Sequence, residues 1–397
     1  MTDFATRARD ALADQGISMR QAARTLNYDV AYLSRVLKGK QRPSENLRRG
    51  LDRLTGAGGA LLAASITGPA AAGDAGAESG DDLEAVELAR RVRASDVGAE
   101  TLDRLEGAFD ELAVRYQTAP PPELLSDVRR HLSYVTKLLD DRKTLSEHRR
   151  LIVLGGWLSL LAATLHVDLR QSRAAAARLT TAASLAQHAE HPEIHAWTYE
   201  TEAWRALTTG DYPRAVELSQ AAQYVAPRGG SAELQATAQE GRARARLGQR
   251  REAYDAIERV QRLATTMVLR ARAEHHYQYD PAKATSYTAT TLAWMGDPAA
   301  EQPAREVIAQ FHLGGDATSW PRRAVSAHID LALTLLSCDR LDEACDVARR
   351  AIASGRLLPA NHWRALEIVR AVEGRGLPEA AELREAYEEL RPGVGEK

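Results

Sequence analysis

Small residues recur at fixed places around four short turns in the second half of the chain. In the clearest case Gly210 and Asp211 form the turn, Ala203 stands seven residues before the glycine, and Ala215 and Ala222 follow it. Two helices can cross closely only where Ala or Gly removes side-chain bulk between them. Such a set therefore predicts a pair of antiparallel helices whose tightest contact lies at the alanines.

The same arrangement returns at irregular intervals. Gly248 lies 38 residues after the first glycine, Gly296 lies 48 residues after Gly248, and a fourth unit surrounds Asp339. A weaker unit lies between Ala162 and Ala183. These units resemble degenerate tetratricopeptide repeats, and the alternative is a generic helical bundle. The resemblance implies that residues 83–397 form a tetratricopeptide-like α-superhelix. Because no segment alternates as a strand does, the predicted fold class is all-α.

The stretch from Ser18 to Ser44 is organised differently, as two short helices joined by a tight turn and followed by a basic loop. Asp29 is placed to cap the second helix. In that helix Leu33, Val36 and Leu37 recur at helical spacing and predict a buried face. The polar face of the second helix is then left to enter a groove of DNA.

A longer pattern supports this interpretation: Tyr32-Leu33-Ser34-Arg35-Val36, then Gly39-Lys40, then Pro43-Ser44. It resembles the helix-turn-helix domain of the Xre and phage-repressor-like family over roughly residues 4–54. Joined to helical repeats, such a domain is similar to the helix-turn-helix and tetratricopeptide regulators of high-GC Gram-positive bacteria. More distantly, it resembles the peptide-sensing quorum regulators of Gram-positive bacteria. The resemblance implies a transcription factor whose body senses a signal.

Helical geometry separates candidate base contacts from candidate phosphate contacts. The first two turns of the second helix are expected to face base edges, through Val30, Ala31, Tyr32, Ser34 and Arg35. Polar and basic residues around them are better placed for phosphates, namely Ser18, Arg20, Gln21, Lys38, Lys40 and Arg42. For each basic residue alone the alternative is a solvated surface charge, and for Tyr32 it is packing within the domain.

Charge is distributed unevenly along the chain. Up to Leu54 there are eleven Lys or Arg and six acidic residues, a net charge of +5, so the remainder carries −7 of the total of −2. Attraction to phosphates supplies most non-specific DNA affinity. DNA binding is therefore expected of the N-terminal part alone. The predicted partner is double-stranded DNA with a two-fold symmetric operator, read by a homodimer.

These observations predict three segments. Residues 1–55 form the helix-turn-helix domain, residues 56–82 form a flexible linker of small residues with a reach of about 30 Å, and residues 83–397 form the helical-repeat domain for sensing and dimerisation. No apolar run looks long enough to cross a bilayer, and the N-terminus lacks a signal peptide. We therefore expect a cytoplasmic protein without a membrane partner.

Aromatic and cationic residues cluster where the inner helices of the repeats are expected. The candidate ligand contacts are Trp204, Arg205, Arg242, Arg246, His275, His276, Tyr277, Tyr279 and Tyr287. Buried packing is the alternative for most of the aromatic residues, but the stretch Arg272 to Tyr279 is polar and aromatic together. The expected signal is a small peptide or a metabolite. The peptide-sensing families hold a ligand backbone with asparagines, whereas this body has a single one, Asn361. Arg, Gln, His and Tyr could substitute for asparagine, but the peptide hypothesis is weakened.

Enzyme signatures are absent from the sequence. There is no phosphate-cradling glycine loop, metalloprotease HExxH, paired CxxC or Gly-x-Ser-x-Gly elbow. His188, His191 and His195 have a spacing that could hold a metal, but Pro192 interrupts their helix. We predict no catalytic residues, no metal and no cofactor. The sequence favours a ligand-responsive transcriptional regulator, and the alternative is a DNA-tethered scaffold that recruits a partner protein through its repeats.

Overall fold

The computed structural model describes residues 4–26, 28–64, 86–88, 90, 95–266, 274–279, 281–311 and 321–390. Every regular element within these ranges is a helix, which confirms the expected all-α fold class. The chain divides into two compact units, residues 1–91 and residues 92–397. We call the described part of the first unit up to residue 64 the head, and the second unit the body.

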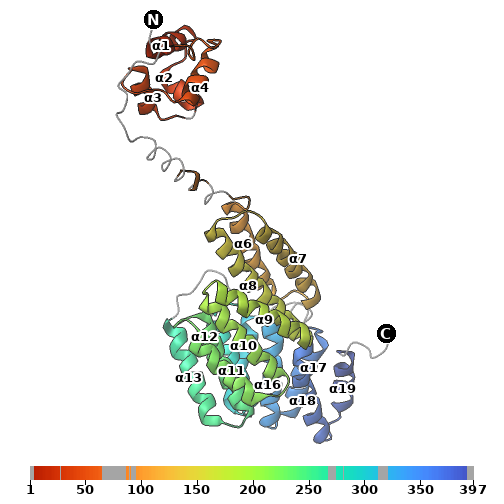
Figure 1. Ribbon diagram of the computed structural model, residues 1–397. Coiled ribbons are helices and arrows are strands. Elements are labelled where there is room, and N and C mark those ends of the chain that lie inside the picture. Colours follow the sequence, from red (N-terminus) through yellow and green to blue (C-terminus); the bar gives the residue numbers. More distant parts are fainter. Residues whose placement is uncertain are drawn as a thin grey trace. The chain divides into compact units, whose positions relative to one another are not determined.

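Four helices form the head: α1 (Phe4–Asp14), α2 (Met19–Thr25), α3 (Val30–Leu37) and α4 (Glu45–Thr55) (Figure 1). Each contributes apolar side chains to one core, in which Phe4, Leu33, Leu47 and Leu51 are at most 1% exposed. The periodic leucines of the sequence therefore face inward as expected.

The packed part of the head extends past α4. Leu61 is only 1% exposed within the core of the head, and its backbone N–H donates to the buried side chain of Asp52 at 3.0 Å. Ala64 is buried in the same core. The sequence placed this stretch in a flexible linker over residues 56–82, of which residues 65–82 lie outside the described residues. Leu61 and Ala64 thus complete the core of the head.

The helices of the body begin at Ala99. In chain order they are α6 (Ala99–Arg115), α7 (Pro121–Asp140), α8 (Leu145–Asp168), α9 (Ser172–His188), α10 (Pro192–Thr208), α11 (Tyr212–Val225), α12 (Ser231–Arg246), α13 (Arg250–Thr266), α14 (Pro281–Trp294), η1 (Pro298–Ala300), α15 (Glu301–Gln310), α16 (Arg322–Ser337), α17 (Leu341–Ala353), η3 (Pro359–Asn361), α18 (His362–Gly374) and α19 (Ala380–Glu389).

From α8 onward the body is a series of helix pairs. Helix α8 packs on α9, α10 on α11, α12 on α13, α14 on α15, α16 on α17 and α18 on α19 (Figure 1). The first helices of consecutive pairs also contact one another. This is the packing of a helical-repeat superhelix, in which each unit rests on its neighbours. The first helices of the pairs form one continuous inner layer.

Each of the four turns predicted from the sequence lies between two helices. Gly210 joins α10 to α11 with φ of 85°, and Asp339 joins α16 to α17 with φ of 59°. A left-handed residue ends a helix sharply and lets the next helix return beside it. The alanines on either side of the first turn, Ala203 before it and Ala215 after it, are fully buried where α10 and α11 meet.

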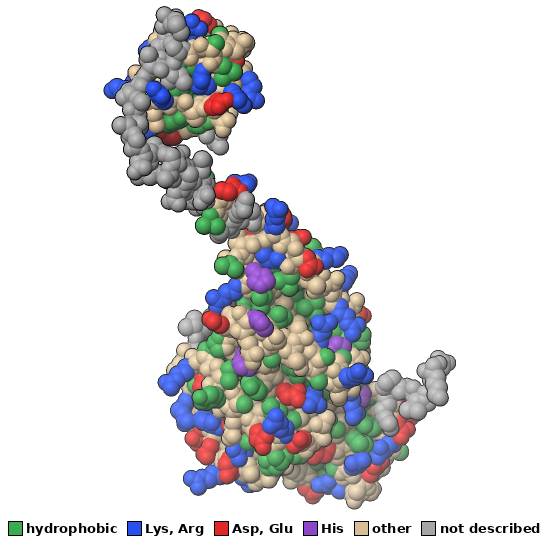
Figure 2. Space-filling view, viewed as in Figure 1, with side chains coloured by type: hydrophobic (Ala, Val, Ile, Leu, Met, Phe, Trp, Pro, Cys, Tyr) green, Lys and Arg blue, Asp and Glu red, His purple; other side chains and the backbone are tan. Residues whose placement is uncertain are grey.

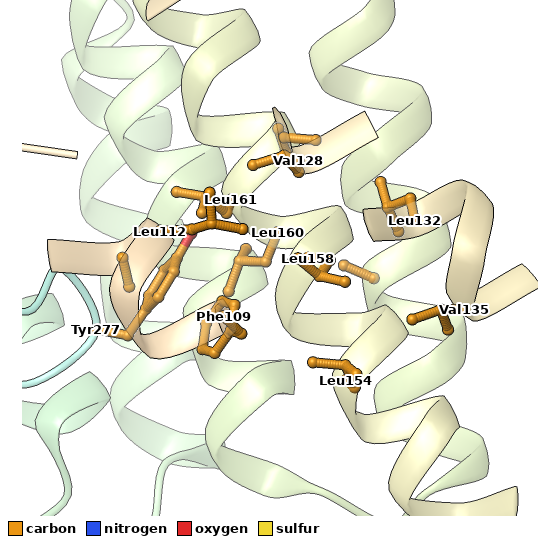
Figure 3. Packing of buried hydrophobic residues seen from close by; sticks show 14 of the residues in the cluster. Phe109, Leu112, Val128, Leu132, Val135, Leu154, Leu158, Leu160, Leu161 and Tyr277 are labelled. Carbon is orange, nitrogen blue, oxygen red and sulfur yellow. The ribbon is translucent and has the colours of Figure 1, made fainter. Parts of the chain in front are cut away.

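Helix α8 is apolar around most of its circumference. By length and composition it could cross a membrane, with a mean hydropathy of 1.6 over its most apolar window, so the expectation that no such run exists was wrong. However, 83% of that window is buried inside the protein. Figure 3 shows Leu154 and Leu158 of α8 facing Val135 of α7. Leu161, also of α8, and Phe109 of α6 lie nearer to Tyr277 in the same cluster. A helix that is hydrophobic all round is typical of the centre of a large core.

The stack of helix pairs returns to its beginning. Helix α8 contacts η3, although nearly two hundred residues separate them. Arg322 at the start of α16 holds this closure, because its guanidinium donates to the carbonyl of Ala119 at 3.0 Å and to the carboxylate of Asp168 in α8 at 3.2 Å. The inner layer of the body is therefore enclosed by its own first and last helices.

Candidate functional site

Helix α3 divides cleanly into a buried and an exposed face. Leu33, Val36 and Leu37 are at most 5% exposed in the core of the head. Val30 is 38% exposed, and Ala31 and Arg35 are also exposed. The exposed side chains lie on the face that the sequence assigned to base contacts, while Tyr32 and Ser34 are half-buried beside it. Within the head, one helix thus has an exposed outer face.

Side-chain caps fix α3 against α4. Asp29 accepts the backbone N–H of Tyr32 at 2.9 Å and so begins α3. The hydroxyl of Tyr32 in turn accepts the backbone N–H of Ser44 at 3.2 Å, and Ser44 caps α4 through the N–H of Leu47. The ring of Tyr32 stacks on Tyr28 with centroids 5.7 Å apart. Tyr32 therefore positions the two helices, which matches the packing alternative given for it.

The predicted phosphate contacts fall into two groups. Ser18 and Gln21 form a capping box at the start of α2, in which the N–H of Ser18 donates to Gln21 Oε1 at 3.0 Å and the N–H of Gln21 donates to Ser18 Oγ at 3.3 Å. The basic members are all exposed, namely Arg20, Lys38, Lys40 and Arg42. Figure 2 shows Lys and Arg side chains spread over the surface of the head. Sequence reasoning overlooked Gln41, whose Oε1 accepts from Arg35 Nε at 2.9 Å and orients that guanidinium.

A cavity of about 140 Å³ lies on the inner layer of the body. Each first helix of a pair from α8 to α18 contributes to its walls. The lining residues are Tyr116, Gln117, Thr164, Asp168, Glu200, Thr201, Trp204, Gln235, Arg242, His276, Lys283, Ser286, Tyr287, Thr290, Arg322, Arg323, Ser326, Leu358, Asn361 and Arg364. Leu358 is the one aliphatic side chain among these residues, so the walls are polar and aromatic.

Five cationic side chains and two acidic side chains line this cavity. The cations are Arg242, Lys283, Arg322, Arg323 and Arg364, and each is at most 8% exposed. Most have counter-charges or carbonyls nearby: Arg364 pairs with buried Asp330 behind the wall, and Arg323 pairs with Glu274 at 2.9 Å. The acidic pair is Asp168 and Glu200. The lining therefore carries an excess of positive charge.

Arg242 differs from the other arginines of the wall. It is 7% exposed, and no carboxylate of the described residues lies within ion-pair distance of it. Its guanidinium lies 4.2 Å from the ring centroid of Tyr287 and 5.3 Å from that of Trp204, and it donates to Gln239 Oε1. Its Nε has no hydrogen-bond partner. A buried cation held between two aromatic rings is thus aimed at the cavity.

Burial shifts the acid–base behaviour of the lining. It raises the pKa of the Asp168 carboxyl to about 6, although Arg322 and the hydroxyl of Tyr116 oppose the shift. It also raises the pKa of Glu200, against a hydrogen bond from Gln235. The pKa of His276 is well below its ordinary value because of burial and the nearby Lys283. These shifts favour the neutral forms of Glu200 and His276, whereas Asp168, with a pKa of about 6, is still mostly ionised at pH 7. The five lining cations therefore still outnumber the ionised acids.

The structure separates the nine candidate ligand residues into two groups. Trp204, Arg242, His276 and Tyr287 line the cavity together. The other five lie elsewhere: Arg205 pairs with Glu202, Arg246 pairs with Glu367 at 2.8 Å, His275 is buried beside Phe109, Tyr277 packs in the core around Phe109 and Leu161, and Tyr279 packs near Leu234 (Figure 3).

Sequence reasoning missed most of the charged lining, including Asp168, Lys283, Arg322 and Arg364. In the sequence these residues look like the surface charges of ordinary amphipathic helices. One signal was present in α8, where Asp168 follows a long apolar run and is fully buried. A lone charge at the end of such a run is a candidate for a buried polar site.

The four helices of the head, with α3 capped and exposed, define a helix-turn-helix DNA-binding domain. In agreement, residues 3–65 match the family model described as a helix-turn-helix domain. The match ends where the packed core of the head ends. No curated protein matches the chain. The chain therefore carries a helix-turn-helix DNA-binding domain joined to an all-α helical-repeat body, which supports a DNA-binding regulator.

Proposed function

We propose that this chain is a ligand-responsive transcriptional regulator that works in the cytoplasm as a homodimer. The head reads a two-fold symmetric operator, and the cavity of the body binds a small signal that changes DNA binding. The cavity of about 140 Å³ with its charged lining is the observation that carries the sensing part of this proposal. The DNA-binding part rests on the match of residues 3–65.

A charged cavity is costly if its only purpose is to hold helices together. Buried arginines lose hydration, and replacing such charges with well-packed apolar residues often leaves stability unchanged or improves it. Helical repeats elsewhere in the body pack through alanine, as Ala203 and Ala215 do. Concave sites with a few convergent polar groups are typical of ligand binding. The polar lining therefore supports a signal site at this place in the stack.

The repeats themselves support the proposed tetratricopeptide-like assignment. Ala332, Ala344 and Ala351 are fully buried where α16 and α17 meet, as the repeated pattern requires. A superhelix of this kind changes shape through small rotations between units. A signal with different affinity for two such shapes shifts the balance between them. Two heads in a dimer would then be presented to half-sites at different spacings.

The proposal is tested by selecting random duplex DNA with the purified full-length protein at one fixed salt concentration, while sedimentation reports its oligomeric state. We expect a two-fold symmetric motif and a dimer. A cell-extract metabolite fraction is then added to the complex with the selected DNA, and a change in affinity is expected. Absence of any selected motif contradicts the regulator function. Selection of a motif with no response to metabolites, together with a copurifying protein, would favour the scaffold instead.

A further inference from the structure

The chemistry of the cavity wall points to the class of molecule that it receives. We propose that the signal is a small organic anion, with its carboxylate or phosphate group held by Arg242, and that it is a metabolite rather than a peptide. This inference rests on the proposed sensing function and names the ligand class of the same site.

Size separates metabolites from peptides. A cavity needs about 10–15 Å³ to hold one water molecule. The cavity of about 140 Å³ therefore has room for roughly ten water-sized groups. A metabolite of about ten non-hydrogen atoms fits this space, whereas a peptide of five residues has several times as many. The inner layer is also short of asparagine, with only Asn361 in the wall. The volume of the cavity therefore suits a molecule of about ten non-hydrogen atoms, which favours a metabolite over a peptide.

The hydrogen-bond donors of the wall that lack partners indicate the sign of the charge on the ligand. Arg242 Nε and Arg364 Nε are buried donors without hydrogen-bond partners. Both side chains are at least nine-tenths buried, at 7% and 3% exposed. A buried donor that finds no acceptor costs about 1–3 kcal/mol, and more when it is charged. An anionic acceptor inside the cavity removes this penalty.

Repulsion among the arginines supports the same conclusion. Burial lowers the pKa of Arg364, and the neighbouring Arg246 and Arg242 lower it further, although Asp330 opposes both effects. Glu367 pairs with Arg246 and Asp330 pairs with Arg364, whereas Arg242 has no carboxylate of the described residues within ion-pair distance. Its charge acts on Glu200 and Asp330 only from farther away, where it opposes the rise in their pKa values. Arginine forms planar, two-pronged bonds with carboxylates and phosphates. A bound anion would supply the missing counter-charge.

Other lining groups fit the uncharged part of such a metabolite. Asp168 Oδ1 and Asn361 Oδ1 are buried acceptors without partners, and both residues are at least nine-tenths buried. They suit a hydroxyl or amino group of the ligand. The rings of Trp204 and Tyr287, which already flank Arg242, offer flat surfaces to a planar or aliphatic carbon skeleton. The wall thus matches a hydroxylated or aminated acid better than a purely apolar one.

Matched pairs of small molecules test the charge requirement on the full-length protein. The pairs are malate with malamide, 4-hydroxybenzoate with 4-hydroxybenzamide, and glycerol 3-phosphate with glycerol, each at millimolar concentration and constant ionic strength set with chloride. We expect at least one anion to raise Tm by several degrees and to bind in calorimetry, while its neutral counterpart does neither. Comparing malate and 4-hydroxybenzoate with glycerol 3-phosphate shows whether the site prefers a carboxylate or a phosphate.

Variants then place the anion at Arg242. Arg242→Gln is expected to weaken binding of that anion about ten- to a hundredfold, the range for a hydrogen bond to a charged group. Arg242→Lys, which keeps the charge, should recover part of the affinity. The matched control is Arg244→Gln, in the same helix but paired with Glu240 outside the cavity, and its affinity should stay within about twofold of the wild type. Circular dichroism verifies that each variant is folded.

Three outcomes overturn the inference in distinguishable ways. Neutral counterparts that bind as well as the anions show that charge is not recognised, and the cavity then remains a ligand site. Equal loss in Arg242→Gln and Arg244→Gln places the anion elsewhere in the body. No binding by any member of the panel, combined with no response of DNA binding to the extract fraction, removes both the inference and the proposed sensing function.

Discussion

Arg35 and Lys40 are both exposed in the head, but only Arg35 lies on α3, the helix that we propose reads base edges. The contact from Arg35 Nε to Gln41 leaves its terminal nitrogens available for the edge of a guanine. We expect Arg35→Ala to cost about 1–3 kcal/mol on the selected operator and to relax one base position. Lys40→Ala should weaken binding to all sequences alike and lower the salt slope by about one.

Fluorescence anisotropy on a panel of single-base operator variants measures both effects at fixed salt. Glu45 and Arg49 form an exposed pair on α4, so Arg49→Ala is a matched control for the loss of a surface charge that lies away from α3. If Arg35→Ala and Lys40→Ala lose affinity equally on every member of the panel, the division into base and phosphate contacts is wrong.

Asp168 makes the stability of the body depend on pH. Burial raises its pKa from 3.8 to about 6 in the folded body, so the folded state holds this proton more tightly than the unfolded state. Its contribution to stability is fully present below pH 3.8 and is lost as the pH rises through about 6. The shift corresponds to roughly 3 kcal/mol. Asp168→Asn carries no such titration.

We therefore expect the unfolding free energy of Asp168→Asn, relative to the wild type, to rise by about 2 kcal/mol between pH 4 and pH 7. Urea unfolding at several pH values measures this difference. Tryptophan fluorescence reports on the body alone, because all six tryptophans follow residue 92. A difference that is constant over this range would show that Asp168 ionises normally.

At the scale of helices, Gly241 tests how closely α12 and α13 approach. A Cβ atom at this position would lie 3.1 Å from the Cβ of Ala256. Both atoms sit directly on helix backbones, so neither can turn away. Overpacking of this kind costs about 1–3 kcal/mol, which outweighs the gain of roughly 1 kcal/mol in helix propensity. Gly241→Ala should therefore destabilise the body.

Gly107 in α6 is the matched control, since a Cβ there meets nothing within 4 Å. Gly107→Ala should stabilise the body by about 0.5–1 kcal/mol through propensity alone. Urea unfolding followed by tryptophan fluorescence compares the two variants. If both glycine substitutions stabilise, α12 and α13 are less tightly packed than the structure indicates.

The helices themselves could be predicted from the sequence because their causes are local. Gly210 and Asp339 mark turns, and Ala203 and Ala215 mark a crossing, through steric rules that act within about twenty residues. The burial of Leu61 in the head could not be predicted in this way. It follows a glycine-rich stretch, and its burial depends on hydrogen bonds to Asp52 that no periodic pattern announces.

At the scale of the whole chain, the cavity depends on contacts that sequence patterns do not report. Arg322 meets Asp168 across 154 residues, and Arg246 meets Glu367 across 121. Trp204 and Arg242 could be predicted as ligand contacts from the sequence, because aromatic and cationic residues are conspicuous on alanine-rich helices. Arg364 could not be predicted in this way, because a lone arginine on an amphipathic helix is most often a surface charge. Closure of the stack decides which charges become buried.

The coupling of the cavity to the head is testable by its reciprocity. If an anion bound in the cavity changes operator affinity by some factor, operator DNA must change the affinity for the anion by the same factor. We expect a factor of about 5–150, the usual range for coupled sites. Calorimetry of the full-length protein with the anion, in the presence and absence of saturating operator DNA, measures one side of this cycle. Anisotropy with and without the anion measures the other.

Arg242→Gln gives the decisive comparison for this coupling. It removes the cation that lacks an acidic partner but leaves α3 and its caps unaltered, so DNA affinity without the anion should be unchanged. At anion concentrations that saturate the wild type but not the variant, the effect of the anion on DNA binding should disappear. Equal anion affinities with and without operator DNA would mean that anion binding in the cavity is not coupled to DNA binding by the head.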